Sequence, residues 1–264
     1  MYKVRPKKSL GQHFLHDQQI ARRIVDSLVL KGDAMPVLEI GPGMGVLTKY
    51  LTERSDVDLR VVEIDRDSIA YLKQHFPSLE GRIIEGDVLE KDLTTVFPGR
   101  FSVIGNFPYN ISSQIFFKVL ERRDTVDQVV CMLQKEVADR MAASHGSKTY
   151  GILSVLLQAF FRIHYLFKVS PGVFTPPPKV MSAVIRLERN DVQRLACDEV
   201  MFVRVVKQAF NTRRKTLRNA LKNLNLPAEI SALEIMNKRA EQLSVEEFVS
   251  LTLLIEQRRG GASG

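Results

Sequence analysis

The chain has 264 residues, of which 45 % are hydrophobic and 26 % charged, the composition of a globular protein with room for a large and a small domain. Its cysteines, Cys131 and Cys197, lie far apart without a Cys or His partner at ligand spacing, which argues against disulfides and a structural metal and favours a reducing compartment. No apolar run is long enough for a membrane span or a signal peptide, so we expect a cytoplasmic protein.

The net charge is +8 and the sequence pI is about 9.5, but the distribution of charge is more informative than its sum. Residues 1–23 hold six basic side chains and one acid, and residues 201–228 hold seven basic side chains and no acid. Two such clusters favour a polyanionic partner such as nucleic acid. The alternative is that both clusters are ordinary solvated helix faces.

Between residues 37 and 135, short apolar runs rich in β-branched residues alternate with segments of helical spacing. This alternation predicts a parallel sheet covered by helices on both faces, an α/β fold. The expected strands are Val37–Ile40, Arg60–Ile64, Arg82–Glu85, Phe101–Gly105 and Gln128–Leu133, and the expected helices are Val46–Glu53, Asp67–His75 and Ser112–Arg122.

Two further strands are expected, Ile163–Val169 and Val180–Leu187, joined by a proline-rich loop and forming an antiparallel pair at the sheet edge. After residue 190 only amphipathic helices are expected. We therefore predict a domain of residues 1–190 and a helical domain of residues 191–264, ending in a disordered glycine-rich tail. The expected helices of the second domain are Met201–Phe210, Arg213–Leu224 and Val245–Glu256.

The densest motif is Glu39-Ile-Gly-Pro-Gly-Met-Gly45, which follows the first expected strand. Glycines such as Gly41 and Gly43 allow a tight turn and a close approach of an adenosine ligand to the backbone. Glu63 ends the next strand, where a carboxylate can bind both ribose hydroxyls, and Asp87 follows the third strand, where it can meet an adenine amine. The pattern favours S-adenosylmethionine, with a nicotinamide cofactor as the competing interpretation.

Asn106-Phe-Pro-Tyr109 follows the fourth strand and should lie on the same rim of the sheet. The N6 amine of adenine is a poor nucleophile because its lone pair is delocalised into the ring. Two acceptors, the Asn106 side-chain oxygen and the Phe107 carbonyl, could bind both amine protons and direct the lone pair at a methyl group. Pro108 would stiffen the turn and Tyr109 would stack the base. The alternative is a structural turn after a strand.

Through these motifs the sequence resembles the ribosomal RNA adenine N6-dimethyltransferases over about residues 5–256, in particular the branch that acts on small-subunit rRNA. The resemblance implies a Rossmann-like class I S-adenosylmethionine-dependent methyltransferase sheet with a small C-terminal helical domain. The most distinctive matching segments are Lys8–Leu15, Glu39–Gly43, Gly105–Ser112, Phe174–Val180 and Ala209–Arg218.

The resemblance also implies a set of cofactor-binding positions, with S-adenosylhomocysteine as the product left after transfer. The family's Gly-Gln-Asn-Phe-Leu segment reads Gly11-Gln-His-Phe-Leu15 here, so His13 replaces the common Asn. A His can still donate to the methionine carboxylate of the cofactor, and Leu15 is the other implied cofactor contact of this segment. The implied positions are His13, Leu15, Gly41, Gly43, Glu63, Ile64, Asp87, Val88 and Asn106.

On the RNA side, the family commonly has Leu where this chain has Phe107, and because only the backbone of that residue is needed the change should be tolerated. Phe174 matches an aromatic that covers the second face of a base flipped onto Tyr109. The implied partner is small-subunit rRNA in the 30S subunit, modified at two adjacent adenosines near its 3′ end by a monomeric enzyme. Phosphate contacts are expected from Arg213, Arg214, Lys215 and Arg218.

Three alternatives remain open at this point. A large-subunit rRNA methyltransferase of the antibiotic-resistance type shares the glycine loop and an Asn-x-Pro-Tyr motif, although segments 146–151 and 210–218 favour the small-subunit branch. A ribosome-assembly or mitochondrial transcription factor that lost catalysis is disfavoured by intact Asn106–Tyr109 and Glu63. A nicotinamide oxidoreductase would leave Asn106–Tyr109 unexplained.

Overall fold

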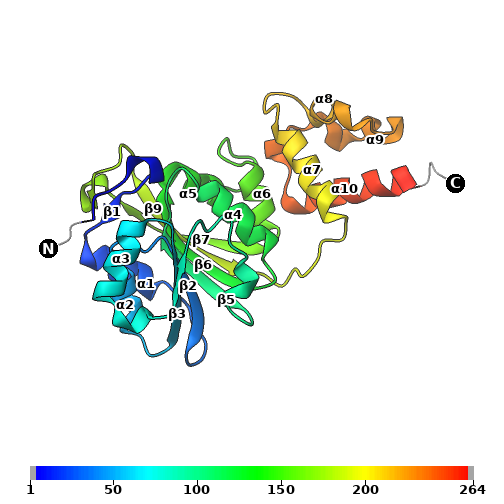
Figure 1. Ribbon diagram of the computed structural model, residues 1–264. Helices are drawn as coiled ribbons and strands as arrows, with labels where there is room; N and C mark the ends of the chain where they lie inside the picture. Colours follow the sequence, from blue (N-terminus) through cyan, green and yellow to red (C-terminus); the bar gives the residue numbers. More distant parts are fainter. Residues whose placement is uncertain (1–3, 261–264) are drawn as a thin grey trace. The chain divides into compact units, whose positions relative to one another are not determined.

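The computed structural model describes residues 4–260, so the last four residues of the predicted disordered tail lie outside the described part (Figure 1). Within that part, seven strands form one sheet in the order β4-β3-β2-β5-β6-β9-β7, and a second sheet pairs β1 with β8. The strands are β1 Phe14–Leu15, β2 Met35–Ile40, β3 Val57–Glu63, β4 Ile83–Glu85, β5 Phe101–Asn106, β6 Val126–Gln134, β7 Phe161–Val169, β8 Phe174–Thr175 and β9 Ser182–Arg189.

The predicted α/β class and the parallel sheet are confirmed. β2 pairs in parallel with β3 and β5, β3 with β4, and β5 with β6. β9 pairs antiparallel with β6 and lies between β6 and the edge strand β7. The α-helices are α1 Gln18–Asp26, α2 Thr48–Thr52, α3 Arg66–His75, α4 Ser112–Glu121, α5 Lys135–Ala142, α6 Ile152–Gln158, α7 Glu199–Phe210, α8 Leu217–Ala220, α9 Ala228–Ala232 and α10 Val245–Gly260.

The alternation of side chains along the strands divides the core into two layers. One face of the sheet packs against α1, α2 and α3, whereas α4 lies on the opposite side (Figure 1). The first layer is built from buried aliphatic side chains of helices and strands, namely Ala21, Ile24, Val25, Leu47, Leu51, Leu72, Val37, Leu59, Val61, Ile104, Val130 and Met132. The parallel strands are therefore buried on both faces, as βαβ connections require.

Because β2, β3, β4 and β5 are parallel, their carboxyl ends meet on one rim of the sheet. The glycine loop follows β2, Glu63 ends β3, Asp87 lies two residues beyond β4, and Asn106 ends β5. The predicted functional positions are thus collected on this rim by strand direction alone. The two-stranded sheet adds β1 from the N-terminal segment, with Leu15 opposite Phe174 of β8.

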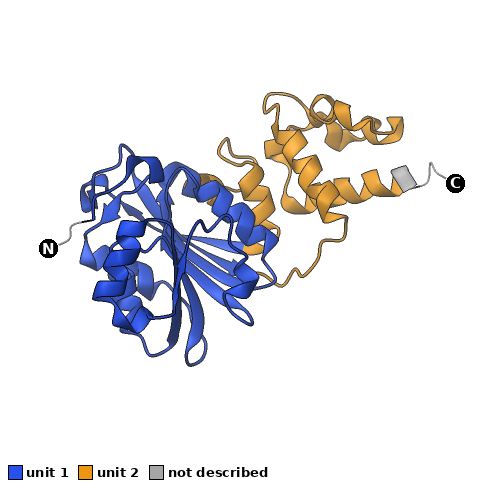
Figure 2. Ribbon diagram, in the orientation of Figure 1, with its two compact units in different colours: residues 1–138, 162–189 blue, residues 139–161, 190–264 orange. Residues whose placement is uncertain are grey.

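The chain divides into two compact units, shown in different colours in Figure 2. Unit 1 comprises residues 1–138 and 162–189 and contains the parallel strands. Unit 2 comprises residues 139–161 and 190–264, so residues 139–161 cluster with the C-terminal helices rather than with the sheet. Aromatic rings explain part of this grouping, since Tyr150 packs edge-on to Phe210 at 6.1 Å and Phe210 lies 5.9 Å from Phe248.

One predicted helix, Arg213–Leu224, is wrong. Residues 211–214 form a turn, and within the expected range only the short helix α8 and the 3₁₀ turn Lys222–Leu224 are helical. The Leu217 N–H donates to the Lys238 carbonyl at 2.8 Å, and Thr216 forms a β-bridge with Arg239. These backbone partners from a distant segment override the helical propensity of the sequence.

Helix α1 was not predicted, although its start signal is present in the sequence. Asp17 precedes the helix and accepts hydrogen bonds from the backbone N–H groups of Gln19 and Ile20 at 2.9 and 3.0 Å, as an N-cap residue does. Its inward side chains, Ala21, Ile24 and Val25, are buried at helical spacing. Among the helices that the structure describes, none combines the length and the apolar character that crossing a membrane requires.

Gly105 is the position where β5 tolerates no side chain. A Cβ placed there would lie 2.5 Å from the Ile40 carbonyl oxygen and 3.0 Å from the Phe107 ring. We predict that Gly105→Ala costs about 1–3 kcal/mol of stability and lowers Tm by roughly 2–10 °C. Gly99→Ala, where a Cβ meets nothing within 4 Å, is the matched control. Equal Tm values for both variants in a thermal melt would contradict this close approach.

Candidate active site

A cavity of about 230 Å³ opens at the carboxyl ends of the parallel strands. Most of the predicted site residues line it, namely His13, Gly41, Gly43, Glu63, Ile64, Asp87, Val88, Asn106, Phe107, Pro108 and Tyr109. Leu15 lines a smaller neighbouring cavity of about 40 Å³ together with Glu39 and the glycine loop. Phe174 lines neither cavity; it is 3 % exposed and belongs to the core.

The Glu63 carboxylate joins the two loops that form the floor of the cavity. Its Oε2 accepts a hydrogen bond from the Gly43 N–H of the glycine loop at 3.0 Å. Its Oε1 accepts from the Ile64 and Asp65 N–H groups, both at 2.9 Å, at the end of β3. Gly43 has φ +58, a left-handed conformation that glycine adopts without strain and that turns its N–H toward the carboxylate.

A carboxylate offers about four lone-pair sites, and three of those of Glu63 are used by backbone N–H groups. Binding both hydroxyls of a ribose needs two sites, so one of these three N–H groups must give way when a ribose binds in the predicted manner. Burial raises the pKa of Glu63, while the backbone hydrogen bonds lower it. The Glu63 side chain is therefore held in place by backbone hydrogen bonds, and one lone-pair site remains for a ligand.

The cavity walls also fit the adenine end of an adenosyl group. Ile64 is 47 % exposed although it is a large apolar residue, and it lines the cavity, so it presents an apolar surface that a ring could cover. Asp87 uses Oδ1 to accept the Leu89 N–H at 2.9 Å. The other carboxylate oxygen, Oδ2, does not take part in that hydrogen bond, so it can accept one from the exocyclic amine of an adenine. These residues fit S-adenosylmethionine.

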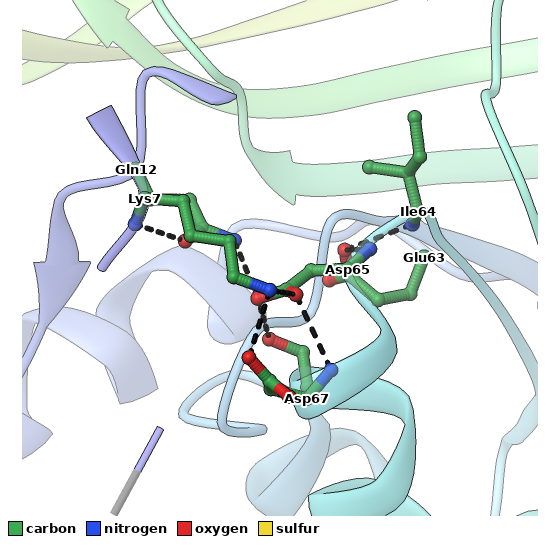
Figure 3. A network of polar contacts seen from close by, with 7 residues as sticks. Lys7, Gln12, Glu63, Ile64, Asp65 and Asp67 are labelled. Carbon is green, nitrogen blue, oxygen red and sulfur yellow. Dashed lines mark hydrogen bonds and ion pairs between the residues drawn. The ribbon is translucent and has the colours of Figure 1, made fainter. Parts of the chain in front are cut away.

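An N-terminal strap, residues 7–15, crosses the rim and contributes Leu10 to Phe14 to the cavity wall. Figure 3 shows the polar network that attaches it to the loop after Glu63. Lys7 forms ion pairs with Asp65 and with Asp67, the latter at 2.8 Å, and Gln12 Nε2 donates to Asp65 Oδ2 at 3.1 Å. Ile64 points away from this network (Figure 3).

Asp65 is central to that attachment. It is 2 % exposed, caps helix α3 by accepting the Asp67 N–H at 3.2 Å, and accepts the Ser68 hydroxyl at 3.1 Å. Burial raises its pKa, but hydrogen bonds from Lys7, Gln12 and Ser68 hold the net pKa below its usual range. The carboxylates of Asp65 and Asp67 in turn raise the pKa of Lys7. The strap is therefore bound to an aspartate whose ionised form is favoured by its hydrogen bonds.

The catalytic loop predicted at Asn106–Tyr109 is anchored to strand β6 and helix α4. The Phe107 N–H donates to the Met132 carbonyl at 3.0 Å, and the Phe107 ring is 1 % exposed and packs 5.8 Å from Phe116. The Asn106 amide nitrogen donates to the His13 carbonyl of the strap at 3.0 Å. Because the nitrogen is used in this way, the Asn106 amide oxygen is left as the group that can accept from a substrate amine.

Tyr109 is held by a hydrogen bond of 2.5 Å between its hydroxyl and that of Ser182. Burial raises its pKa, so the ring stays an uncharged phenol. The His13 imidazole stacks on it, with centroids 5.3 Å apart and an interplanar angle of 29°. The aromatic neighbour of Tyr109 is therefore His13, whereas the predicted neighbour Phe174 is packed in the core beside Leu15.

The predicted RNA-binding residues of unit 2 separate into two groups. Arg213 donates to the carbonyls of Lys148 and Tyr150 at 2.6 and 2.9 Å, and Arg218 donates to the Ser231 carbonyl at 3.0 Å. Arg214 and Lys215 are exposed and make no such contact within the described residues. In that same part of the chain, no group of three or more His, Cys, Asp and Glu side chains is arranged to hold a metal ion.

Comparison with known proteins identifies this arrangement. The family model "Ribosomal RNA adenine dimethylase" matches residues 4–257. The chain is 59 % identical over 255 residues to ribosomal RNA small subunit methyltransferase A of Cytophaga hutchinsonii, covering 97 % of this chain and 99 % of the relative. It is 60 % identical over 256 residues to the protein of that name in Parabacteroides distasonis, covering 96 % and 95 %.

The chain belongs to the ribosomal RNA adenine dimethylase family. As a member it is an S-adenosylmethionine-dependent rRNA adenine dimethyltransferase with the class I methyltransferase fold. A dimethyladenosine transferase from Plasmodium falciparum superposes with a TM-score of 0.76 at 26 % identity, covering 94 % of this chain and 98 % of that chain. The 23S rRNA methyltransferase ErmE superposes with a TM-score of 0.66 at 25 % identity, covering 90 % and 99 %.

Sequence reasoning missed the residues that fasten this dimethylase's strap and catalytic loop. Lys7, Gln12 and Asp65 were not identified, although the Glu63-Ile-Asp65 succession placed an acid two residues after a predicted ligand. Ser182 was missed because only the fold brings it to Tyr109, 73 residues away in the sequence. Glu39 was noted only as the first residue of the glycine motif.

Glu39 is a buried carboxyl behind the glycine loop. It is 1 % exposed and accepts a hydrogen bond from the Thr48 hydroxyl at 2.6 Å. Burial raises its pKa to about 8, the Thr48 hydrogen bond opposes that shift, and the nearby Glu63 adds to it. The neutral form is thus favoured in the folded state, so ionisation of Glu39 costs folding energy as pH rises.

We predict that Glu39→Gln stabilises the protein in a pH-dependent way. An unfolded Glu ionises near pH 4.5 and folded Glu39 near 8, so the wild type loses stability relative to the variant between these values and the difference then levels off. The gain at pH 9 should be on the order of a few kcal/mol. Tm values of both proteins from pH 5 to 9 check this, and a constant difference would contradict it.

We also predict that Lys7→Ala weakens cofactor binding by loosening the strap. The ion pairs of Lys7 are partly exposed, so the expected loss of S-adenosylhomocysteine affinity is about threefold to fivefold. Lys8→Ala removes the same charge from the next, exposed position and should leave the affinity unchanged. Calorimetric titration measures both. Equal effects of the two variants would show that bulk charge, and not the Asp65 attachment, matters.

Proposed function

We propose that this chain transfers methyl groups from S-adenosylmethionine to the N6 atoms of two adjacent adenosines near the 3′ end of small-subunit rRNA, during assembly of the small ribosomal subunit. The observation that carries the proposal is the Asn106 amide, whose nitrogen donates to the His13 carbonyl at 3.0 Å and whose oxygen is left to receive an amine. The amide lies on the rim beside the residues that fit the cofactor.

The bound cofactor supplies an electrophilic methyl group on a sulfonium sulfur. In each of the two transfers to one adenine, the N6 lone pair would take the methyl group, the C–S electron pair would stay on sulfur, and one N6 proton would be released to water. The first transfer leaves one N–H on N6 and the second leaves none. A strong base is unnecessary, because the proton is acidified once nitrogen has formed its fourth bond.

Asn106 and the Phe107 carbonyl act together on the amine before the first transfer, whereas before the second transfer one N–H remains and one of the two acceptors binds it. When both accept its N–H bonds, the nitrogen lone pair is drawn out of the ring and directed along the line of attack. The buried Phe107 ring and the hydrogen bond of Tyr109 to Ser182 keep this loop in one conformation. Holding two reactants in the correct geometry accelerates their reaction as much as raising the concentration of one of them to an effective value on the order of 10⁵–10⁸ M would. Positioning is thus the main catalytic contribution of the chain.

Small-subunit rRNA is proposed as the substrate because of which relatives are most similar. The proteins named for the small subunit are 59 % and 60 % identical over nearly the whole chain, whereas the 23S rRNA enzyme ErmE is 25 % identical. We further propose that the protein acts as a monomer in the cytoplasm. Its cysteines are buried and unpaired, in keeping with a reducing compartment.

Transfer of labelled methyl groups to unmethylated small subunits, followed by nucleoside analysis, tests the proposal. The expected product is N6,N6-dimethyladenosine at two adjacent positions near the 3′ end, and Asn106→Ala should lose transfer while binding S-adenosylhomocysteine within about tenfold of the wild type. Label found only in large-subunit RNA would move the chain to the other rRNA branch. Normal turnover by the Asn106 variant would refute the role of the amide.

In unit 2, we predict that Arg214 and Lys215 bind RNA phosphates and that Arg213 has mainly a structural role. Replacing Arg214 and Lys215 together by Ala should weaken binding to small subunits and reduce the slope of log affinity against log salt by about 2. Arg213→Ala removes the hydrogen bonds to the Lys148 and Tyr150 carbonyls, so it should lower Tm. An unchanged salt slope in the double variant would exclude these two residues from the interface.

A further inference from the structure

Asn110, the residue after Tyr109, carries a side-chain amide at the wall of the cavity. The Ile111 N–H donates to the Pro108 carbonyl at 3.2 Å, which closes a turn with Tyr109 and Asn110 at its two central positions. Asn110 is exposed and lines the cavity together with Asn106 and Tyr109. Within the described part of the chain, the Asn110 side chain makes no hydrogen bond, so its donor and its acceptor are both available to a ligand.

The backbone of Gly11 sets the place of this amide. A Cβ on Gly11 would come 2.6 Å from Asn110 Oδ1 and 3.8 Å from Asn110 Nδ2, so the amide occupies the space that a side chain at position 11 would need. Gly11 has φ +62, a conformation that glycine adopts without strain. The Asn110 amide is therefore packed against the strap backbone while its polar atoms remain unpaired.

The proposed chemistry leaves part of the adenine edge without a partner. The Asn106 oxygen and the Phe107 carbonyl would accept from the N6 amine, and two acceptors can bind the exocyclic amine of any base that has one. In adenine the amine is flanked by the ring nitrogens N1 and N7, which are both acceptors. A donor beside the two acceptors would therefore read the ring as well as the amine, and a side-chain amide is a common partner of adenine.

We propose that Asn110 is a specificity-determining residue, whose amide donates to a ring nitrogen beside N6 of the target adenine. This inference deepens the proposed function and rests on it, because it takes the adenine amine to be held at Asn106. Enzymes that act on an extruded base read it through hydrogen bonds to its edge. Guanine presents an oxygen where this set of groups requires an amine, and it carries a proton on N1, so it does not fit.

The first measurement is cofactor affinity, which does not depend on the RNA substrate. Asn110→Ala and Asn110→Asp should bind S-adenosylhomocysteine within about twofold of the wild type in calorimetry. Gln114→Glu is the matched control, because Gln114 is exposed on helix α4, lies outside the cavity wall and gains the same negative charge as Asn110→Asp. A loss of about tenfold in the Asn110 variants would place the amide in the cofactor site and overturn the inference.

The second measurement is methyl transfer to unmethylated small subunits. Both Asn110 variants lack the N–H donor, so kcat/KM for small subunits should fall by roughly fivefold to a hundredfold, the range for one base-specific contact. KM for S-adenosylmethionine should stay constant, and Gln114→Glu should keep the wild-type values of both constants. If the Asn110 variants keep kcat/KM within about twofold of the wild type, the inference is wrong.

The third measurement removes the partner atom from the substrate. Small subunits are assembled with 7-deazaadenosine or 1-deazaadenosine at the target positions, which replaces N7 or N1 by C–H and keeps the amine. On one of the two analogues, the ratio of wild-type to Asn110→Ala activity should fall to about one, because neither protein can then make the contact. That analogue identifies the ring nitrogen, and changed ring electronics affect both proteins alike and cancel in the ratio.

Two results separate the failure of this inference from the failure of the proposed function. An activity ratio that stays the same on both analogues as on adenosine overturns the inference, while methyl transfer itself is intact. Absence of methyl transfer from the wild type to unmodified small subunits refutes the proposed function, and the assignment of Asn110 to the target base falls with it.

Discussion

The site depends on one carboxylate, Glu63, which receives three backbone N–H groups from two loops. Parallel strands bring the glycine loop and the end of β3 to the same rim, where one backbone hydrogen bond, from the Gly41 N–H to the Val62 carbonyl at 2.9 Å, joins them. The Glu63 side chain adds a partner for three further backbone N–H groups, those of Gly43, Ile64 and Asp65. A buried carboxylate is tolerated in a folded protein only if most of its oxygen lone pairs accept hydrogen bonds, because an unpaired buried charge is costly. Because the carboxylate is nearly saturated, it can bind both hydroxyls of a ribose only when one of these N–H groups yields its place.

The N-terminal strap connects the two ends of the site. At one end Lys7 and Gln12 bind Asp65, two residues after Glu63, and at the other end the His13 carbonyl accepts from Asn106. Gly11 lies between Lys7 and Gln12, and a Cβ there would come 2.6 Å from the Asn110 side-chain oxygen, so the strap passes close to the residue that follows Asn106–Tyr109. The strap therefore links the loop after Glu63 to the Asn106 amide, the group that we propose orients the substrate amine.

The parallel sheet was predictable because apolar runs and helical spacing are local patterns, and strand direction then places Gly41, Glu63, Asp87 and Asn106 on one rim. The short helix α1 was missed despite its Asp17 cap, and Arg213–Leu224 was wrong because Thr216 and Leu217 pair with residues about twenty positions away. The contacts of Tyr109 with Ser182 and of His13 with Pro176 join segments that are distant in the sequence, so no local sequence pattern predicts them. Burial of Phe174 likewise depends on its tertiary partner Leu15.

The most direct test of this account is the cofactor affinity of Glu63→Gln. The Gln amide nitrogen cannot accept, so it would face at least one of the N–H groups of Gly43, Ile64 and Asp65 and separate the two loops. The account predicts a loss of S-adenosylhomocysteine affinity of about a hundredfold, with Glu85→Gln on the exposed end of β4 as an unaffected control. A Glu63→Gln variant that binds within about threefold of the wild type would contradict it.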